Sequence, residues 1–267
     1  MSGWGQGTIN NSIGWGQASS NNSIGWGAVY ADSPSGDTAI SAPSFTNVYS
    51  LDFDGVDDYV DSNFIIPAIS TYTISCWIKK NGVLGSIEGL IGDMNSSGQS
   101  KSGRAAIAVW STGYIYVNMG NGSAYWYDYT SYDLSAYLDN AWHHIALTID
   151  GTALKLYVDG VLKYTYTSTV SAGTIGARPY RIGSSSEGTS GVWGGYIDEV
   201  SIFNTTLSSG DITSIYNSGT PQSLDSYSSL ISWWRFEEGS GTTAIDSGTG
   251  GNDGTLTNGV TYSTDIP

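Results

Sequence analysis

Charge is scarce in this sequence, and positive charge is scarcest. Charged residues make up 12% of the 267 residues, and 9 basic residues stand against 24 acidic ones, which gives a formal net charge of −15. Nucleic-acid binding needs a Lys/Arg surface against the phosphates, so this balance argues against nucleic-acid partners and against anionic membranes. Two interpretations of the acidity stay open: it keeps the protein soluble, or clustered carboxylates bind calcium, which takes oxygen ligands.

Cysteine and long apolar runs are also lacking. The single cysteine, Cys76, allows no disulfide within the chain, and it lies in an apolar strand pattern, so we expect a buried, unreactive thiol. No apolar run reaches membrane-spanning length, so we expect no membrane insertion. The first residues carry neither the basic nor the apolar region of a signal peptide, so we expect a protein that is made and kept in the cytoplasm of the producing cell.

Residues 1–30 contain an internal repeat. Gly-Trp-Gly occurs three times, with the tryptophans separated by 15 − 4 = 11 and 26 − 15 = 11 residues. The glycines and Asn-Ser pairs oppose a helix, and no continuous apolar face is present, so the repeat cannot form a core alone. It predicts an extended arm that becomes ordered against partners, and a flexible low-complexity tail is the alternative. The anchoring side chains would be Trp4, Ile13, Trp15, Ile24 and Trp26.

After a linker at 31–48, short strand patterns alternate with turn signals. Tyr72, Ile74, Cys76 and Ile78 would share one face of a strand. Turn residues at 111–113, 150–151 and 159–160 predict hairpins, and only 208–217 resembles a helix. Many short strands with turns between them predict an all-β, two-sheet antiparallel sandwich.

Several motifs in order resemble one family of such sandwiches. The segments that carry the resemblance are Phe53-Asp54-Gly55, Trp142-His143-His144-Ile145-Ala146, Leu156-Tyr157-Val158-Asp159-Gly160 and Gly195-Tyr196-Ile197-Asp198-Glu199-Val200. They are similar to the laminin G-like jelly roll of the concanavalin A-like superfamily. The resemblance implies such a domain at 49–220. It is specific for the fold and says little about function.

The C-terminal segment, 221–267, departs from the family's order. In such domains a segment like Trp233-Trp234-Arg235-Phe236-Glu237-Glu238 precedes the first motif, whereas here it follows the helix. We rank first a circular permutation that completes the sandwich within the chain, because chain ends often lie close together. Donation of these strands to a neighbouring subunit ranks second, and the start of a truncated second copy is the third alternative.

Catalytic chemistry is not indicated. His143 and His144 are adjacent on a strand, so they would point to opposite faces and could not form a two-histidine metal site. Glycoside hydrolysis needs paired carboxylates on one face. The adjacent pairs, Asp198 with Glu199 and Glu237 with Glu238, would also face opposite ways. We therefore expect no catalytic residues and no enzyme.

A structural Ca²⁺ is the cofactor that the resemblance implies. Its candidate ligands are Asp54, Asp57, Asp58, Asp198 and Asp246, whose oxygens on turns would suit the flexible coordination of calcium. The alternative is that these side chains only stabilise turns by bonding to nearby backbone amides.

An aromatic run offers candidate glycan-binding residues. These are Tyr125, Trp126, Tyr127 and Tyr129, and flat aromatic faces near polar groups suit the lectin functions of this fold. The alternative is one strand whose aromatic residues only pack against its neighbours.

The repeat arm joined to such a domain resembles structural proteins of tailed phages. This implies a virion protein, either a capsid decoration or a head or tail fibre component. Its arm would bind sister subunits, in a homo-oligomer that we expect to be a trimer, and other virion proteins, and its outward domain would bind host glycans. The alternative is a cellular carbohydrate-binding module or lectin without a particle, and a hydrolase is a third hypothesis.

Overall fold

The computed structural model describes seven segments of the chain: 45–65, 69–82, 84–92, 106–120, 125–167, 179–184 and 191–267. The five anchoring residues predicted at 1–30 and the linker up to residue 44 lie outside these segments. Residues 45–267 form one unit by their internal contacts.

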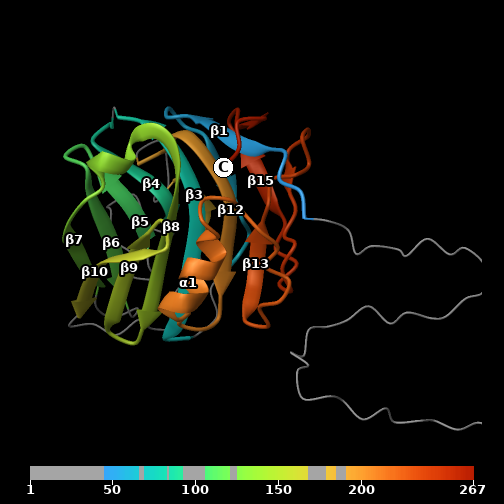
Figure 1. Cartoon of the computed structure of the whole chain (residues 1–267). Helices are drawn as coiled ribbons and strands as arrows, with labels where there is room; N and C mark the ends of the chain where they lie inside the picture. The colour runs from blue at the N-terminus through green and yellow to red at the C-terminus, as the bar shows by residue number, and fades with distance from the viewer. Residues whose placement is uncertain are drawn as a thin grey trace, which may run out of the picture. The chain divides into compact units, whose positions relative to one another are not determined.

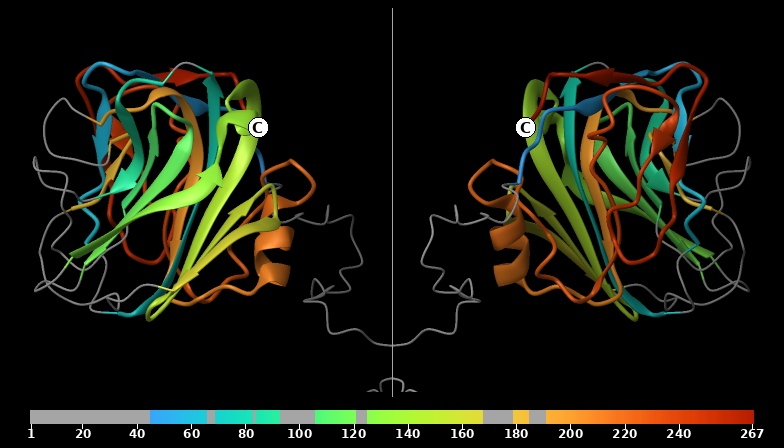
Figure 2. Two further views of the ribbon diagram at one scale, coloured as in Figure 1. Left: turned by 90° about the vertical axis from the view of Figure 1, so that its left-hand side faces the viewer. Right: turned by 90° about the vertical axis from the view of Figure 1, so that its right-hand side faces the viewer.

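Two antiparallel sheets face each other in this unit (Figures 1 and 2). In spatial order the first sheet contains β10 (Val161–Thr167), β9 (Ala153–Val158), β8 (Asp139–Asp150), β3 (Thr71–Asn81), β12 (Gly194–Phe203), β1 (Ser50–Asp54) and β16 (Thr261–Ser263), with β13 (Leu230–Trp234) also paired to β12. The second contains β14 (Thr243–Ala244), β15 (Gly254–Thr257), β2 (Tyr59–Asp61), β11 (Arg181–Ile182), β4 (Ile87–Gly92), β5 (Ala106–Trp110), β6 (Tyr114–Gly120) and β7 (Tyr125–Asp133). The predicted all-β, two-sheet antiparallel sandwich is confirmed.

Alternation along the strands explains the core. In β3, Ile74 and Ile78 are fully buried, and Ile74 lies opposite Leu147 of β8. These residues belong to the cluster that fills the space between the sheets. Cys76 lies on the same face, so the expected buried cysteine is confirmed, and burial raises the pKa of its thiol to about 12.

The predicted hairpins and the helix are confirmed. Turns join β5 to β6, β8 to β9 and β9 to β10. The helix α1 (Ser209–Tyr216) begins with a capping box between Ser208 and Asp211, and a short 3₁₀ helix, η1 (Ser135–Tyr137), precedes β8. Ile212 and Ile215 bury α1 against the outer face of the first sheet, where Figure 1 shows it lying over the strands. Within the described residues, no helix is long and apolar enough to cross a membrane.

The segment after α1 contributes strands to both sheets of its own chain. β13 pairs with β12, β15 with β2, and β16 with β1. β12 is therefore shared on one side: β1 pairs with residues 194–197, and β13 pairs with residues 200–203. Between these two partners, Asp198 and Glu199 have no strand beside them on that side.

Candidate functional site

The gap beside β12 is closed by residues 45–49, which we call the strap. The Glu237 carboxylate accepts hydrogen bonds from the amides of Val48 at 2.9 Å and Tyr49 at 3.2 Å. The Asn47 side chain donates to Asp198 at 2.9 Å, and the Arg235 guanidinium donates to the strap's backbone. Side chains thus replace the missing strand pairing, and they fix the point at which the chain enters the sandwich.

The strap covers two carboxyl groups that lie on the same face of β12. The register between β12 and β3 shifts after Asp198, and Glu199 adopts a left-handed φ of 50°. Asp198 lies opposite Trp77 on the outer face, and Glu199 accepts a hydrogen bond from the Trp233 indole at 2.5 Å on that face too. The expectation that this pair faces opposite ways is wrong, because a β-bulge breaks the alternation.

The two carboxyl groups are deeply buried and hold their protons strongly. Asp198 is 0% exposed and Glu199 is 4% exposed. Burial raises the pKa of Glu199 to about 8, although the Arg235 charge opposes the shift. Burial, and then the charge of Glu199, raises the pKa of Asp198 well above its ordinary value. Glu199 is therefore mostly protonated near neutral pH, and burial makes both groups weaker acids than exposed carboxyl groups.

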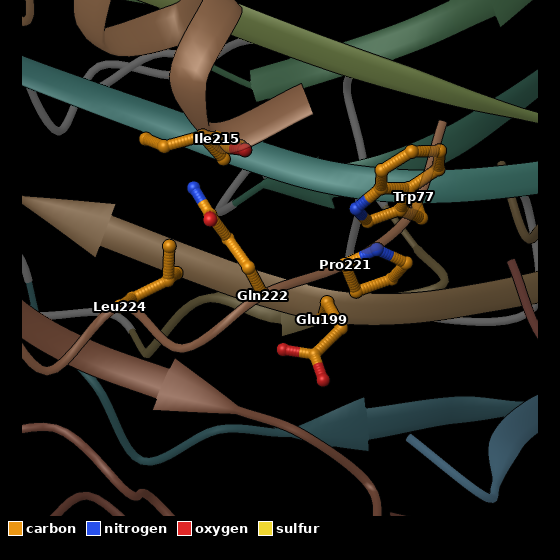
Figure 3. A pocket seen from close by; sticks show the side chains of 7 residues that line it. Trp77, Glu199, Ile215, Pro221, Gln222 and Leu224 are labelled. Carbon is orange, nitrogen blue, oxygen red and sulfur yellow. The ribbon is translucent and has the colours of Figure 1, made fainter. Parts of the chain in front are cut away.

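A small cleft opens beside Glu199 under the end of α1 (Figure 3). The space that it encloses is about 10 Å³, which holds about one water molecule. Figure 3 shows Trp77 on one side and Leu224 on the other, with Gln222 between them; the lining residues are Ser75, Trp77, Glu199, Ile215, Pro221, Gln222 and Leu224. The cleft is too small to admit a sugar chain.

The histidines lie on opposite faces of β8, as predicted. His143 bonds to Asp159 at 2.8 Å and to Asp139 at 3.2 Å, and the bond to Asp159 is the largest cause that raises its pKa. His144 is fully buried and bonds to Ser75 at 2.6 Å, a pairing that the sequence analysis missed.

The Ser75–His144 pair lacks the features of a catalytic dyad. Burial lowers the pKa of His144 to about 4. Its Nδ1 has no hydrogen-bond partner among the described residues, so no carboxylate there orients the ring. The neighbouring rings of Trp77 and Tyr216 pack against it. This arrangement fits a buried polar pair that packs between the first sheet and α1.

The turn between β1 and β2 gathers three carboxylates. One oxygen from each of Asp54, Asp57 and Asp58 lies within 4.8 Å of the others, so this cluster could hold a metal ion. We call residues 54–58 the acidic turn. The turn requires glycine at position 55. Its φ is +76°, and the Cβ of any other residue there would lie only 3.1 Å from Gly194 Cα.

The acidic turn is held together by its own amides. Asp54 Oδ1 accepts from the Val56 amide at 2.7 Å, and Asp58 Oδ2 accepts from the Asp54 amide at 3.0 Å. Asp58 is 2% exposed, and its Oδ1 is buried without a hydrogen-bond partner among the described residues. Burial is the largest cause that raises the pKa of Asp58, and the charges of Asp54 and Asp57 add to it.

The other two predicted calcium ligands lie outside this cluster. Asp198 accepts from Asn47 and from the Glu199 amide. Asp246 accepts from the amides of Trp233, Gly248 and Asn252 at 2.8–2.9 Å. Both carboxylates thus accept hydrogen bonds from nearby backbone amides, and Asp198 also accepts one from a side chain. The structure brings together only the first three of the five.

The predicted glycan-binding residues lie on β7 at an edge of the second sheet. In the register with β6, Tyr129 lies opposite Tyr116, and Trp126 lies opposite Met119. The side chains of Tyr125, Trp126, Tyr127 and Tyr129 lie outside the described residues. The structure therefore positions the strand, and the glycan role stays a prediction.

A two-layered antiparallel sandwich with these motifs defines a lectin-type β fold, and the family comparison agrees. The model of the concanavalin A-like lectin/glucanases superfamily matches residues 54–213. The chain belongs to this superfamily. No curated protein matches the chain.

Solved structures share the fold over more of the chain than the residues that the family model matches. A Bacteroides ovatus protein, described as a candidate carbohydrate-binding protein, is 17% identical with a TM-score of 0.61 over 82% of this chain and 60% of its own. The chain thus spans 60% of the length of that protein. A heptameric SAP-like pentraxin from Limulus polyphemus is 14% identical with a TM-score of 0.52, over 81% of this chain and 95% of its own. At these identities the likeness shows the fold alone.

Proposed function

We propose that this protein is a non-catalytic, lectin-like virion component of a tailed phage that binds host glycans. The observation that carries the glycan-binding part is membership of a superfamily of lectins and glucanases. The fold likeness to the Bacteroides protein, whose description names carbohydrate binding, supports it. We assign the glycan contacts to the aromatic strand β7.

Burial of the one close carboxyl pair on β12 supports binding without cleavage. Glycosidases need two carboxyl groups that reach the scissile bond from the solvent side of a cleft. Asp198 is 0% exposed and bonds to Asn47 of the strap, and Glu199 is 4% exposed beside a cleft that is too small for a sugar chain, so a polysaccharide cannot reach both groups.

The virion assignment rests on the repeated arm. One tryptophan in every 11 residues gives regularly spaced apolar anchors, and large aromatic side chains supply most of the binding energy in protein interfaces. The strap fixes where the chain enters the sandwich. We propose that the arm binds sister subunits, in a trimer, and other virion proteins.

We further propose that the ion at the acidic turn is calcium. Three carboxylates provide an all-oxygen set, and calcium accepts irregular arrangements of such ligands. No nitrogen or sulfur ligand belongs to the cluster, which disfavours zinc.

A glycan array with the full chain tests the binding role. We expect saturable binding to one class of glycans, and Trp126→Ala should weaken it about tenfold or more, because loss of a stacked ring removes a main contact. Tyr114→Ala, an exposed aromatic on β6, is the matched control and should bind as the parent does. No binding to any glycan would contradict the proposed function.

Removal of residues 1–30 separates the virion protein from a cellular lectin. We expect the shortened protein to keep the sandwich and its glycan binding but to be absent from purified particles. Circular dichroism and sedimentation of particles would measure the two properties. Normal incorporation of the shortened protein would refute the anchoring role of the arm.

A further inference from the structure

The acidic turn lies against a second turn that is far away in the sequence. Asn258 follows β15, and its side chain donates to the Asp57 carbonyl at 3.0 Å. A Cβ at the next residue, Gly259, would lie 3.3 Å from Asp58 Oδ1. We call residues 258–259 the C-terminal turn. Figure 1 shows β1 and β15 beside each other at this end of the sandwich.

Both turns connect the same two sheets at the same place. The acidic turn leads from β1 to β2, and the C-terminal turn leads from β15 to β16. β15 pairs with β2 in one sheet, and β16 pairs with β1 in the other. The two turns are therefore stacked at one end, where the Asn258 side chain and the Asp57 carbonyl join them.

One carboxylate oxygen, Asp58 Oδ1, lies where the acidic turn and the C-terminal turn meet. Asp58 Oδ1 is buried without a partner among the described residues, on a side chain that is 98% buried, given its 2% exposure. Carboxylates this close repel one another, and a buried acceptor without a partner costs free energy. A cation bound between Asp54, Asp57 and Asp58 would relieve the repulsion, and one that also contacts Asp58 Oδ1 would remove both penalties.

We propose that a divalent cation at the acidic turn stabilises the C-terminal turn and, with it, the pairing of β15 and β16 with β2 and β1 of their own chain. We call this effect the lock. This inference rests on the proposed calcium site and adds a role for it. β15 has four residues and β16 has three, so few backbone hydrogen bonds hold them. Short terminal strands of this kind open locally at low cost, and an ion that binds only the closed form suppresses that opening.

Hydrogen exchange of the full chain tests the lock. Calorimetric titration with CaCl2 first gives the Kd, and exchange is then followed in EDTA and in excess CaCl2. At free Ca²⁺ about ten times the Kd, amides of β15 and β16 should exchange about tenfold more slowly, which is the factor 1 + [Ca²⁺]/Kd. The β9–β10 hairpin, at the far edge of the first sheet, should keep its exchange rates.

Two variants make the test specific. Asp57→Asn should lose Ca²⁺ binding and the added protection while keeping the exchange rates seen in EDTA. Asp225→Asn changes an exposed carboxylate that accepts a hydrogen bond from Ser223; it is the matched control and should behave as the parent does. Absence of calorimetric Ca²⁺ binding would overturn the calcium site and the lock together. Binding that protects no residue of β15 or β16, or protects all strands equally, would overturn the lock alone.

Discussion

Replacing Trp234 with alanine lowers the free energy of unfolding by about 3–5 kcal/mol, the range for truncation of a fully buried Trp. Trp234 is 0% exposed in β13, and its ring meets Phe64 edge-on with 6.0 Å between centroids. Its indole also donates to the Asn252 carbonyl at 2.9 Å. Loss of the side chain leaves a cavity between the sheets and an acceptor without its partner.

Urea unfolding, followed by far-UV circular dichroism, measures this loss. The control is Ile245→Ala in the same C-terminal segment, where the side chain is 50% exposed. Exposed substitutions of this kind change stability by about 0.5 kcal/mol or less. Equal, small effects of the two variants would mean that β13 does not complete the core of its own chain.

Raising the pH from about 5 to 8 destabilises the fold through the carboxyl pair under the strap. The folded pKa of Glu199 is about 8, raised by burial from an ordinary 4.5. Between these values the folded state holds a proton that the unfolded state releases. Stability from this group is therefore full below pH 4.5, and it is lost as the pH rises toward 8, at about 1.4 kcal/mol per pH unit at most.

Glu199→Gln isolates this contribution. The amide cannot titrate, so the variant should lose less stability than the parent between pH 5 and 8. At pH 5 it should be less stable, because an amide nitrogen would face Arg235 or the Trp233 indole. The two histidines titrate in both proteins, and the difference between the proteins removes their effect. Parallel stability–pH curves would contradict a protonated Glu199.

Local signals in the sequence were sufficient for the elements of the fold. The alternation of Ile74, Cys76 and Ile78 predicted the buried face of β3, and the pattern over 208–217 predicted the helix. These patterns depend on residues two to four positions apart, which interact in the same way in any sandwich.

The arrangement beside β12 could not be predicted, because its partners meet only after folding. Asn47 and Asp198 are 151 residues apart, and Val48 and Glu237 are 189 apart. A bulge at Glu199 reverses the face of one carboxyl group, and no residue type near it signals a bulge. The Ser75–His144 pair was missed for the same reason, since it depends on the register of β3 with β8.

The calcium prediction was based on residue type and spacing, and the structure brings together three of its five candidate ligands. Asp54, Asp57 and Asp58 are close in sequence, so a single turn brings their oxygens together. Asp198 and Asp246 have the same chemistry, but they lie elsewhere in the fold, where they accept hydrogen bonds from Asn47 and from backbone amides. Spacing identified the cluster, and only the structure showed which of the five carboxylates come together.

The most direct test of the account combines binding and product analysis in one sample. The full chain is titrated with the glycan class selected on the array, and free reducing ends are counted over a day at the same protein concentration. We predict a saturable heat of binding and a constant number of reducing ends. A rising number of reducing ends would show a hydrolase, and a flat titration would show that the sandwich does not act as a lectin.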